Sequence, residues 1–527
     1  MRFAGGLRLL LILGALLMAG GARPVARADS PFDPVPYEPL PPDVTMETIV
    51  PTANQLVAMA FTPDGRLLYT ERTGNVRVVV NDQLLPAPVN TFVSVIDTQG
   101  ERGLLGIAVD PGFVLNHYVW AFYTRRTAVN PAQYENRIVR FTLTDDNQGV
   151  DTQRAYGFPV DPFITIHNGG NLHFGPDGQL YISVGNNAPD GDPGTPSQIM
   201  DSPLGKLHRF APTLPLSAAP GNPFAGSSFY AMGLRNSFDF DFDPVGGGVF
   251  ASENGSDCDD ELNRLVPGGN YGWRVPYPCD DATGPDPHYN SLPPLKFWTP
   301  SLAPTGVAFY TGSAIPEWQN DLFMCSYKDA TTALHHFKLN DTRTAVMAHT
   351  LVIDPINHQP IKCRTDVLTG PDGGLYFSEG GGYAGNNGPI KRLIRRASFV
   401  GSTVSPRSPI GQAGGTADVQ IDLRHRGAVE NAFALTVTVP ASAQVLSAEG
   451  WDGELNVTPS QVFWSGAMTG TLTWTMTYHL RITEAVTTPY VLLNDAVLTS
   501  PGLTTLTFAP AIIVNGWAVY LPIGLRA

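Results

Sequence analysis

A histidine followed by two glycines is the most chemically specific feature of this chain. It lies in the segment HNGGN, residues 167–171, directly before an expected strand. A histidine can take up a proton near neutral pH, so His167 could serve as a general base. Gly169 and Gly170 lack a Cβ and would let the backbone approach a flat ligand closely. The alternative is a loop histidine that satisfies backbone groups, and this pentapeptide by itself favours the alternative.

A second polar segment spans residues 252–273, with the sequence SENGSDCDDELNRLVPGGNYGW. Its carboxylates are Asp257, Asp259, Asp260 and Glu261. They could raise the local concentration of cations. A solvated acidic loop is the simpler interpretation, so we do not take these carboxylates as metal ligands.

One recurring phrase would provide the elements that position these segments. It consists of a hydrophobic pair, the sequence Pro-Asp-Gly and a strand in which polar and apolar residues alternate. Pro-Asp-Gly predicts a tight turn because Pro sets φ and Gly accepts a positive φ. The clear copies are FTPDGRLLYT (61–70), FGPDGQLYIS (174–183) and GPDGGLYFS (370–378), and weaker copies start at residues 109, 242 and 309. Six copies over residues 44–397, at a period of roughly 60, predict an all-β fold, a six-bladed β-propeller with a shallow central pocket. The alternative is a pair of β-sandwiches.

The composition changes near residue 398. From there to residue 527 the chain has no Lys and no Cys, and segments such as GTLTWTMTYHLRI alternate with period two. This pattern predicts an antiparallel, immunoglobulin-like β-sandwich over residues 398–516. The tail, residues 517–527, is apolar but far too short to span a membrane. It is expected to be a docking or sorting tag, or a final strand.

Composition excludes several protein classes. The 527 residues include 33 Lys+Arg and 47 Asp+Glu, for a net charge of -14. This acidic balance argues against nucleic-acid binding, which needs a basic face. Only 15% of residues are charged, while Gly (54) and Pro (47) are abundant. These values disfavour a helical bundle, a coiled coil and a cytosolic Rossmann enzyme.

The N-terminus resembles a secretory signal. Residues 1–28 combine Arg2 and Arg8 with a short apolar run and end in Ala-Arg-Ala, a small-x-small cleavage pattern. A retained anchor is the alternative. Residues 29–43 are Pro-rich and are expected to form an extended leader. We therefore expect a secreted, extracellular or cell-surface/periplasmic protein, with no transmembrane segment in the mature chain.

Export makes disulfides plausible for the four cysteines, Cys258, Cys279, Cys325 and Cys363. An even number suggests two bridges, with three possible pairings. Cys258–Cys279 is preferred because it closes a Gly/Pro-rich loop, and Cys325–Cys363 would follow. No CxxC or Cys/His zinc spacing occurs, which argues against a structural metal held by thiolates.

Seven motifs resemble those of the soluble pyrroloquinoline quinone (PQQ)-dependent glucose and aldose sugar dehydrogenases, the glucose/sorbosone dehydrogenase family. They are GRLLYTERTGNVRVV (65–79), ERGLLGIAVDPGF (101–113), HNGGNLHFGPDGQLYISVGN (167–186), YAMGLRNSFDFDFDP (230–244), SENGSDCDDELNRLVPGGNYGW (252–273), APTGVAFYTG (303–312) and RTDVLTGPDGGLYFSEG (364–380). Seven motifs in the family's order, over about residues 44–397, are specific. The resemblance implies a six-bladed propeller, with PQQ held over the central pocket and calcium polarising the quinone.

The resemblance also implies roles for individual residues. His167 matches the base that takes the proton from the sugar C1 hydroxyl while hydride moves to PQQ C5. Arg235, in GLRN, matches the arginine beside the quinone oxygen that gains negative charge, although an exposed ion pair is the alternative. Asn236 matches a position that contacts the cofactor, as the backbone at Gly169 and Gly170 would.

Other positions correspond to the substrate and metal sites. Glu101 lies where the family carries Gln or Glu near the substrate, with a surface carboxylate as the alternative. Tyr271 would either line the pocket or pack beside it. Gly255 and Ser256 fall where two backbone carbonyls bind calcium, and carbonyl oxygen is a suitable hard ligand. Lys328 matches a lysine that contacts PQQ.

The chain departs from the family in two places. The glucose enzymes carry two arginines just before an Asp-Val pair, whereas this chain has Arg364 followed by Thr365 and Asp366. Arg364 is therefore the expected replacement cation for the PQQ carboxylates. Asn186 and Asn187 follow Gly185, where the family commonly has Asp, which would alter the support around the base.

The resulting expectation is an exported PQQ- and Ca²⁺-dependent aldose dehydrogenase that oxidises a sugar at C1 to the lactone. It would pass electrons to an external acceptor. One alternative is a catalytically silent propeller that binds glycans or protein partners, and the missing basic pair favours it. Another is a metal-dependent lactonase, which would need several carboxylates converging on the axis. The sugar, the acceptor and the oligomeric state stay open.

Overall fold

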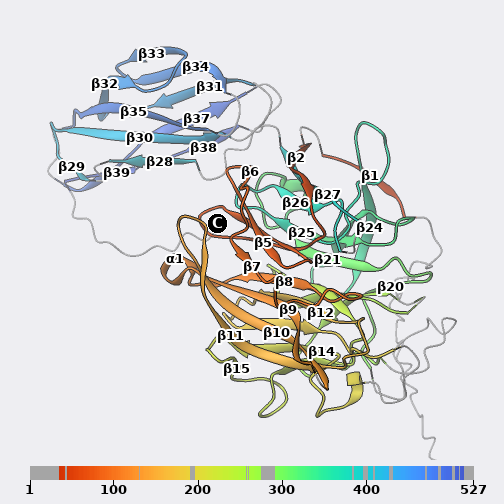
Figure 1. The fold of residues 1–527 in the computed structure, drawn as a ribbon. Helices are drawn as coiled ribbons and strands as arrows, with labels where there is room; N and C mark the ends of the chain where they lie inside the picture. The colour runs from red at the N-terminus through yellow and green to blue at the C-terminus, as the bar shows by residue number, and fades with distance from the viewer. Residues whose placement is uncertain are drawn as a thin grey trace, which may run out of the picture. The chain divides into compact units, whose positions relative to one another are not determined.

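The computed structural model is all-β apart from one short α-helix and two 3-10 turns among its described residues (Figure 1). It describes residues 35–41, 44–129, 131–189, 196–256, 258, 260–273, 291–382, 385–395, 402–407, 410–425, 431–468, 472–484, 488–500, 505–509 and 511–515. The expected signal (1–28) and tail (517–527) lie outside these ranges.

Six antiparallel sheets account for the strands between residues 44 and 395. The first three sheets are built as follows. The first has β3 (Leu56–Phe61), β4 (Leu67–Glu71), β5 (Asn75–Val80), β6 (Gln83–Leu84) and β7 (Asn90–Thr91); the second has β8 (Leu104–Val109), β9 (Tyr118–Val129), β10 (Ala132–Leu143) and β11 (Gly149–Val160), with helix α1 (Phe113–Asn116) before β9; the third has β12 (Gly169–Phe174), β13 (Leu180–Val184), β14 (Lys206–Ala211), β15 (Ser217–Ala218) and β16 (Phe229–Met232).

The other three sheets follow the same plan. The fourth has β17 (Ser237–Phe242), β18 (Val249–Glu253), β19 (Asp260–Leu265) and β20 (Lys296–Trp298); the fifth has β21 (Pro304–Phe309), β22 (Leu322–Ser326), β23 (Leu334–Leu339) and β24 (Val346–Ile353); the sixth has β25 (Val367–Thr369), β26 (Leu375–Ser378), β27 (Gly388–Arg395) and β2 (Val44–Ala53). Strand β2 pairs antiparallel with β27, with Val44 opposite Arg395. Strand β2, which comes first in the sequence of the ring, therefore completes the sixth sheet.

The recurring phrase marks the same connection in every sheet, between its first and second strands. The three Pro-Asp-Gly turns end on Gly65, Gly178 and Gly373, whose φ values are +89°, +72° and +78°. The turn prediction is therefore confirmed. The expected alternation of burial is absent, however, because every residue of β4, β13, β18 and β22 is buried.

Sheet-on-sheet packing explains this difference. Five buried hydrophobic clusters each combine residues of two successive sheets, and a sixth combines the second and third sheets with Val57 of the first. The cluster containing Leu56, Met59, Tyr376 and Ile390 joins the sixth sheet to the first. Each inner strand also lies against that of the next sheet, around a closed ring. Both faces of each sheet are therefore covered, so the second strands bury both sides.

Buried aspartates tie the inner strands together. Asp239 and Asp241 on β17 accept the backbone N–H groups of Val307 (2.8 Å) and Phe309 (2.7 Å) on β21. Asp366, just before β25, accepts the N–H of Met59 on β3 at 2.5 Å. Burial raises the pKa of the Asp241 carboxyl to about 6. These bonds satisfy the buried N–H groups where sheets meet.

The described part of the Pro-rich segment, residues 35–41, contains a short strand. Strand β1 (Tyr37–Pro39) runs parallel to β24 at the edge of the fifth sheet. Glu38 Oε2 lies 2.6 Å from His336 Nδ1, and Asp321 Oδ2 lies 2.9 Å from His336 Nε2. This ion pair fixes the strand against the sheet.

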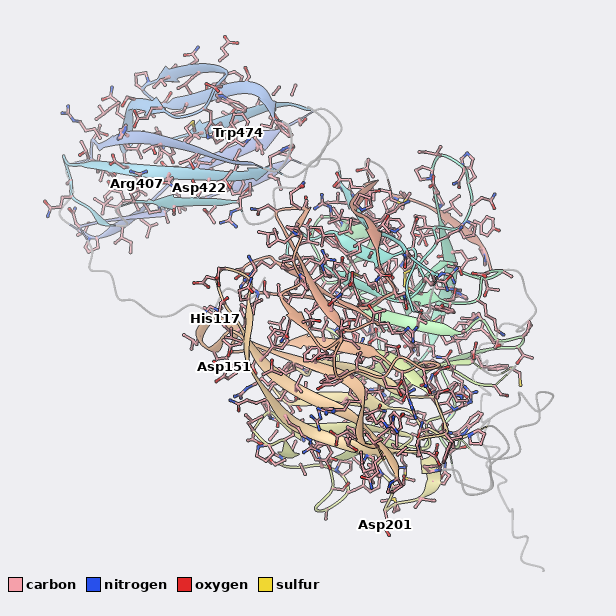
Figure 2. The ribbon with its side chains drawn as sticks, viewed as in Figure 1. His117, Asp151, Asp201, Arg407, Asp422 and Trp474 are labelled. Atoms are coloured by element: carbon pink, nitrogen blue, oxygen red, sulfur yellow. A yellow bond between two sulfur atoms is a disulfide. The ribbon has the colours of Figure 1, made fainter. Side chains whose placement is uncertain are left out.

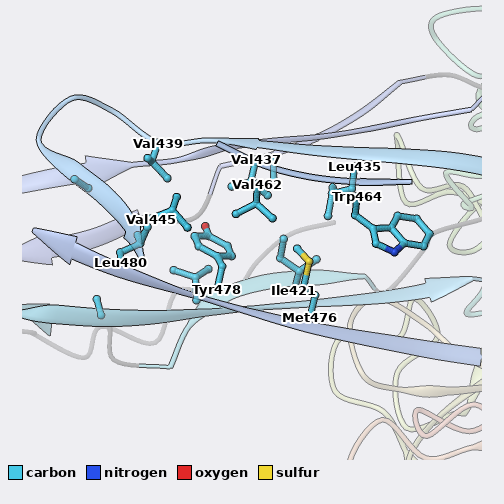
Figure 3. Packing of buried hydrophobic residues seen from close by; sticks show 14 of the residues in the cluster. Ile421, Leu435, Val437, Val439, Val445, Val462, Trp464, Met476, Tyr478 and Leu480 are labelled. Carbon is cyan, nitrogen blue, oxygen red and sulfur yellow. The ribbon is translucent and has the colours of Figure 1, made fainter. Parts of the chain in front are cut away.

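The described strands between residues 402 and 515 form three further sheets. One sheet has β28 (Thr403–Pro406), β30 (Thr416–His425), β35 (Leu472–Ile482) and β32 (Ala443–Glu449); another has β33 (Glu454–Thr458), β34 (Gln461–Met468), β31 (Asn431–Thr438), β37 (Asp495–Thr499) and β38 (Leu506–Phe508); a third has β29 (Ile410–Gly411), β39 (Ala511–Val514) and β36 (Tyr490–Leu493). Buried residues of all three sheets, including Ile421, Trp464 and Leu492, share one core (Figure 3). Outside this core, Arg407 and Asp422 are each hydrogen-bonded to the side chain of Gln420 (Figure 2).

One of the two predicted disulfides, Cys325–Cys363, is present. The structure describes only one cysteine of the other predicted pair, Cys258. Cys325 on β22 is bonded to Cys363, which precedes β25, so the bridge joins the fifth and sixth sheets. Cys258 is also disulfide-bonded, while Cys279 lies outside the described residues. Within the described part of the chain, no helix is long and apolar enough to cross a bilayer.

Candidate active site

Two cavities lie along the inner strands of the ring. One of about 150 Å³ is lined by Val57, Arg72, Glu101, Leu105, Asn168, Gly169, Asn236, Phe238, Asn254, Ala303, Thr305, Tyr327 and Gly382. We call it the hub pocket. The other, about 380 Å³, is lined by later residues of the inner strands, including His173 and Asp241. The second is larger, but the hub pocket contains Glu101, Gly169 and Asn236, three of the residues predicted from the sequence.

His167 lies directly before two residues of the hub-pocket wall. It is itself buried, with 3% of its surface exposed, and has a left-handed φ of +56°. Its Nδ1 lies 2.9 Å from Asn186 Oδ1. Asn186 Oδ1 also accepts the N–H of Ala188 at 3.2 Å, which identifies this atom as the oxygen. The hydrogen-bond network therefore assigns the proton to Nδ1 and leaves the lone pair on Nε2.

The two glycines after His167 differ in whether they line the hub pocket. Gly169 (φ +59°) lines the hub pocket and donates its N–H to Asn236 Oδ1 at 3.0 Å. Gly170 (φ +112°) packs on the second sheet, where an added Cβ would lie 2.8 Å from Phe122 Cε1 and 2.9 Å from Leu105 Cβ. At Gly169 an added Cβ would likewise meet protein, 2.8 Å from Gly185 N and 2.9 Å from Ser183 O. Both glycines are therefore required by close packing, and only Gly169 also lines the pocket.

Glu101 lies in the pocket wall and also contacts His167. Its Oε2 accepts the backbone N–H of His167 at 2.6 Å. Its own N–H donates to Thr165 O at 2.8 Å. The carboxylate predicted to lie near the substrate is thus bonded to the segment that carries the candidate base.

Arg235 and Asn236 are held from behind by a buried carboxyl group. Glu253 Oε1 accepts the N–H of Arg235 (2.9 Å) and that of Asn236 (2.6 Å). Burial raises the pKa of Glu253 to about 8. The Arg235 guanidinium donates to Asn254 O at 3.0 Å and lies 5.2 Å from the Trp273 ring. Its position beside the pocket residue Asn254 is thereby fixed.

The segment with the predicted calcium ligands is tied to the pocket wall by Asp260. Asp260 Oδ1 accepts the N–H of Gly255 at 2.9 Å, and Oδ2 accepts those of Leu302 and Ala303, each at 2.6 Å. Burial raises the pKa of Asp260 to about 6. Asp260 is therefore a buried structural residue and not part of a solvated loop, since only 1% of it is exposed.

Ser256 belongs to the same segment as Gly255, whereas Asp257 and Asp259 lie outside the described residues. Over the described ranges, no group of three or more His, Cys, Asp or Glu side chains could hold a metal ion.

The predicted cations of the fifth and sixth sheets lie around the pocket residue Tyr327. Lys328 follows Tyr327 and its Nζ is bonded to Ser301 Oγ. Arg364 donates to Tyr327 O (3.0 Å) and to Asp329 Oδ1 (2.6 Å), and its guanidinium lies 5.0 Å from the Tyr327 ring. The Cys325–Cys363 disulfide joins the two segments that carry these residues.

Tyr271 lies apart from this group. It is buried in a cluster between the third and fourth sheets, where its hydroxyl donates to Arg264 O at 2.6 Å and accepts the N–H of Val266 at 2.9 Å. It is absent from the hub-pocket lining. Of the two placements considered for it, the structure therefore places Tyr271 in packing.

Sequence reasoning missed three residues at this site: Arg72, Glu253 and Tyr327. Arg72 and Tyr327 line the pocket, and Glu253 supports Arg235. Arg72 and Glu253 are both within quoted family motifs, and an ionisable residue at the end of a buried strand was the available signal. Tyr327 is marked only by its position next to Lys328.

Comparisons with known proteins agree with this geometry. Aldose sugar dehydrogenase YliI of Escherichia coli (strain K12) is 28% identical over 352 residues, covering 64% of this chain and 90% of the relative. Quinoprotein glucose dehydrogenase B of Acinetobacter calcoaceticus is 28% identical over 337 residues, covering 58% of this chain and 68% of the relative.

Structural similarity extends over the same region. The PQQ-bound aldose sugar dehydrogenase from Streptomyces coelicolor superposes with a TM-score of 0.53 and 29% identity, covering 67% of this chain and 99% of that one. The chain shares the all-β propeller fold of these enzymes, which confirms the predicted all-β propeller. The model of the family described as Glucose / Sorbosone dehydrogenase matches residues 53–390, and the chain therefore belongs to this family.

Proposed function

We propose that this protein is an exported, PQQ- and calcium-dependent aldose dehydrogenase that oxidises a sugar at C1 to its lactone. The observation that carries the proposal is the hub pocket, whose wall includes Asn236 and the two residues after His167, Asn168 and Gly169. Asn186 Oδ1 holds the Nδ1–H of His167. The electrons would pass on to an external acceptor. In this proposal the six sheets over residues 44–397 are the blades of a six-bladed propeller, and residues 398–516 form an immunoglobulin-like accessory domain.

The residues around the pocket fit PQQ, a flat group with three carboxylates. Gly169 contributes backbone to the pocket wall, and Arg72 brings a cation to it. Arg235 adjoins the pocket through Asn254, and Lys328 and Arg364 adjoin it at Tyr327. Cationic donors are the groups that bind carboxylates best. The carbonyls of Gly255 and Ser256 would hold the calcium ion.

The chemistry would be divided as follows. PQQ, when bound, supplies the acceptor for the hydride that leaves the sugar C1. His167 takes the proton of the C1 hydroxyl on Nε2, because its Nδ1–H is already donated to Asn186. Arg235 supplies positive charge where negative charge develops. The C1–O bond thereby becomes the carbonyl of the lactone.

The test uses full-length mature protein mixed with PQQ and Ca²⁺, assayed for aldose-dependent dye reduction. EDTA should lower the activity, and His167→Ala should reduce it about 10²–10⁴-fold. His117→Ala is the matched control, because His117 has nearly the same φ (+55°) but lies at the end of α1 (Figure 2). PQQ should also raise the melting temperature of the wild-type protein.

A catalytically silent propeller that binds glycans or protein partners is the second candidate. It is favoured by Arg364, which is engaged by Asp329 instead of being held ready for a ligand. If PQQ with Ca²⁺ neither raises the melting temperature nor supports dye reduction, this second proposal replaces the first. A lactonase would hydrolyse lactones with metal alone.

A further inference from the structure

We propose that Glu101 is a positioning residue for His167, and that Arg72 holds Glu101 in place. The proposal rests on the function proposed above and adds to it a contact between two loops. Glu101 and His167 are 66 residues apart in sequence and belong to loops that enter the second and third sheets. Their contact is a 2.6 Å hydrogen bond from the His167 backbone N–H to Glu101 Oε2.

His167 needs external support because of its backbone conformation. A φ of +56° is unusual for a residue with a Cβ and persists only where the surroundings determine it. Three bonds do so: the N–H is held by Glu101, the carbonyl accepts the N–H of Asn187 (3.1 Å), and Nδ1 contacts Asn186. The bond to Glu101 is the one of these three that comes from another sheet. Its loss would free the backbone on the N-terminal side of the imidazole.

Arg72 fixes the loop that carries Glu101. Its Nη1 donates to the carbonyls of Thr98 (2.9 Å), Gly100 (3.0 Å) and Arg102 (2.9 Å). Only 7% of Arg72 is exposed, whereas Thr98 and Gly100 are exposed residues, so a buried guanidinium anchors an exposed stretch of the loop. Together the three carbonyls bracket Glu101 on both sides. All three bonds come from one nitrogen with two N–H groups, so at least one N–H is shared between two carbonyls.

Arg102 joins the same loop to the segment before His167. It is fully buried and donates to the carbonyls of Asp161 (2.7 Å) and Ile164 (3.0 Å). The loops around residues 97–103 and 161–167 are thus bonded at several points. Arg72, Glu101 and His167 form one connected path from the first sheet to the candidate base.

A role in binding the sugar directly is the competing explanation for Glu101, because this residue lines the pocket. The two roles predict different kinetics. Losing a positioning residue misplaces the base and lowers kcat, whereas losing a substrate contact formed equally in ground and transition states raises KM. They also differ in what a neutral amide can do, since the oxygen of Gln can still accept the His167 N–H.

The test compares Glu101→Gln, Glu101→Ala and Arg72→Met in full-length protein loaded with PQQ and Ca²⁺. Glu101→Gln should keep kcat within about threefold, while Glu101→Ala and Arg72→Met should lower it on the order of 10–100-fold with KM for the sugar nearly unchanged. Arg66→Met is the matched control. Arg66 is also 7% exposed and donates to Thr144 O at 3.0 Å, away from the hub pocket, so its loss should lower stability without lowering kcat.

A second measurement does not depend on activity. Hydrogen–deuterium exchange at the His167 amide, followed by mass spectrometry without PQQ, should be slow in wild type, Glu101→Gln and Arg66→Met. It should be faster in Glu101→Ala and Arg72→Met. If wild type is inactive but this exchange pattern holds, the proposed function fails and the positioning contact stands. The positioning proposal is overturned if Glu101→Ala raises KM at constant kcat, if Glu101→Gln is as damaging as Glu101→Ala, or if exchange at His167 is unchanged. Should Glu101→Ala fail to fold, Arg72→Met and Glu101→Gln decide by the same criteria.

Discussion

The imidazole of His167 is oriented by an amide: its Nδ1 lies 2.9 Å from Oδ1 of Asn186. Because Asn186 Oδ1 also accepts a backbone N–H, it can only be an acceptor, and Nδ1 must be the donor. The amide therefore fixes the tautomer without placing a negative charge beside the ring.

The first prediction concerns this neutral partner. Asn186→Asp should place a carboxylate next to the imidazole, which favours its protonated form. The acidic limb of the pH–rate profile for kcat should move to higher pH, because the base is then unprotonated only at higher pH. The measurement is kcat against pH for both proteins. An unshifted limb would mean that another group limits the rate at low pH.

A second prediction separates the glycines by their surroundings. Gly170→Ala should cost about 2–4 kcal/mol of unfolding free energy, because the new methyl group meets Phe122 and Leu105 and φ is +112°. Gly178→Ala is the control: φ is +72°, but an added Cβ has nothing within 4 Å. It should cost only about 1–2 kcal/mol. Urea unfolding compares the two, and equal losses would contradict the packing argument.

The third prediction concerns the bridge between the fifth and sixth sheets. The Cys325–Cys363 disulfide closes a loop with a sequence separation of 38 residues. Replacing both cysteines with Ser should lower stability by about 2–4 kcal/mol, since the unfolded chain gains freedom. PQQ should also bind less tightly, because Tyr327 and Arg364 lie next to the bridge. Denaturant unfolding and PQQ titration check these effects, and unchanged PQQ affinity would separate the bridge from the pocket.

A fourth prediction links the N-terminal strand to pH. Burial acts to raise the pKa of Glu38, but its hydrogen bond and charge interaction with His336 lower it to about 2. Burial acts to lower the pKa of His336, but hydrogen bonds to Asp321 and Glu38 raise it above 6.5. The Glu38 contribution is present above its unfolded pKa of 4.5 and is lost as pH falls toward 2. The His336 contribution is present below 6.5 and is lost as pH rises through its higher folded pKa.

The pair should therefore be strongest between about pH 4.5 and 6.5. Glu38→Gln should lower the unfolding free energy by about 1–3 kcal/mol in that window, with a smaller loss on either side. Thr350→Val, which removes another hydrogen-bond partner of Glu38 and leaves both charges, is the control for the neutral part of the network. If Glu38→Gln lowers the unfolding free energy by the same amount at every pH, the charges of Glu38 and His336 are not coupled.

Local patterns were enough to predict the repeating unit and part of the site. The Pro-Asp-Gly phrase fixed the connection between first and second strands because a turn depends on the φ values of consecutive residues. The placement of Gly169 and Asn236 near a ligand was implied by the resemblance of the HNGGN and GLRN segments to the family, and both residues line the hub pocket. Both segments are short motifs whose backbone geometry is determined nearby.

The placement of Glu101, Tyr271 and Asp260 could not be predicted in this way. Each depends on bonds between residues far apart in sequence, such as the 2.6 Å contacts from Asp260 to Leu302 and Ala303. The same holds for Arg72 and Tyr327, which reach one pocket from different sheets. The sequence by itself determined the strands and their turns, and its resemblance to the family supplied His167 as the candidate base. Only closure of the ring decided which side chains meet at the hub, because closure brings the ends of successive inner strands together.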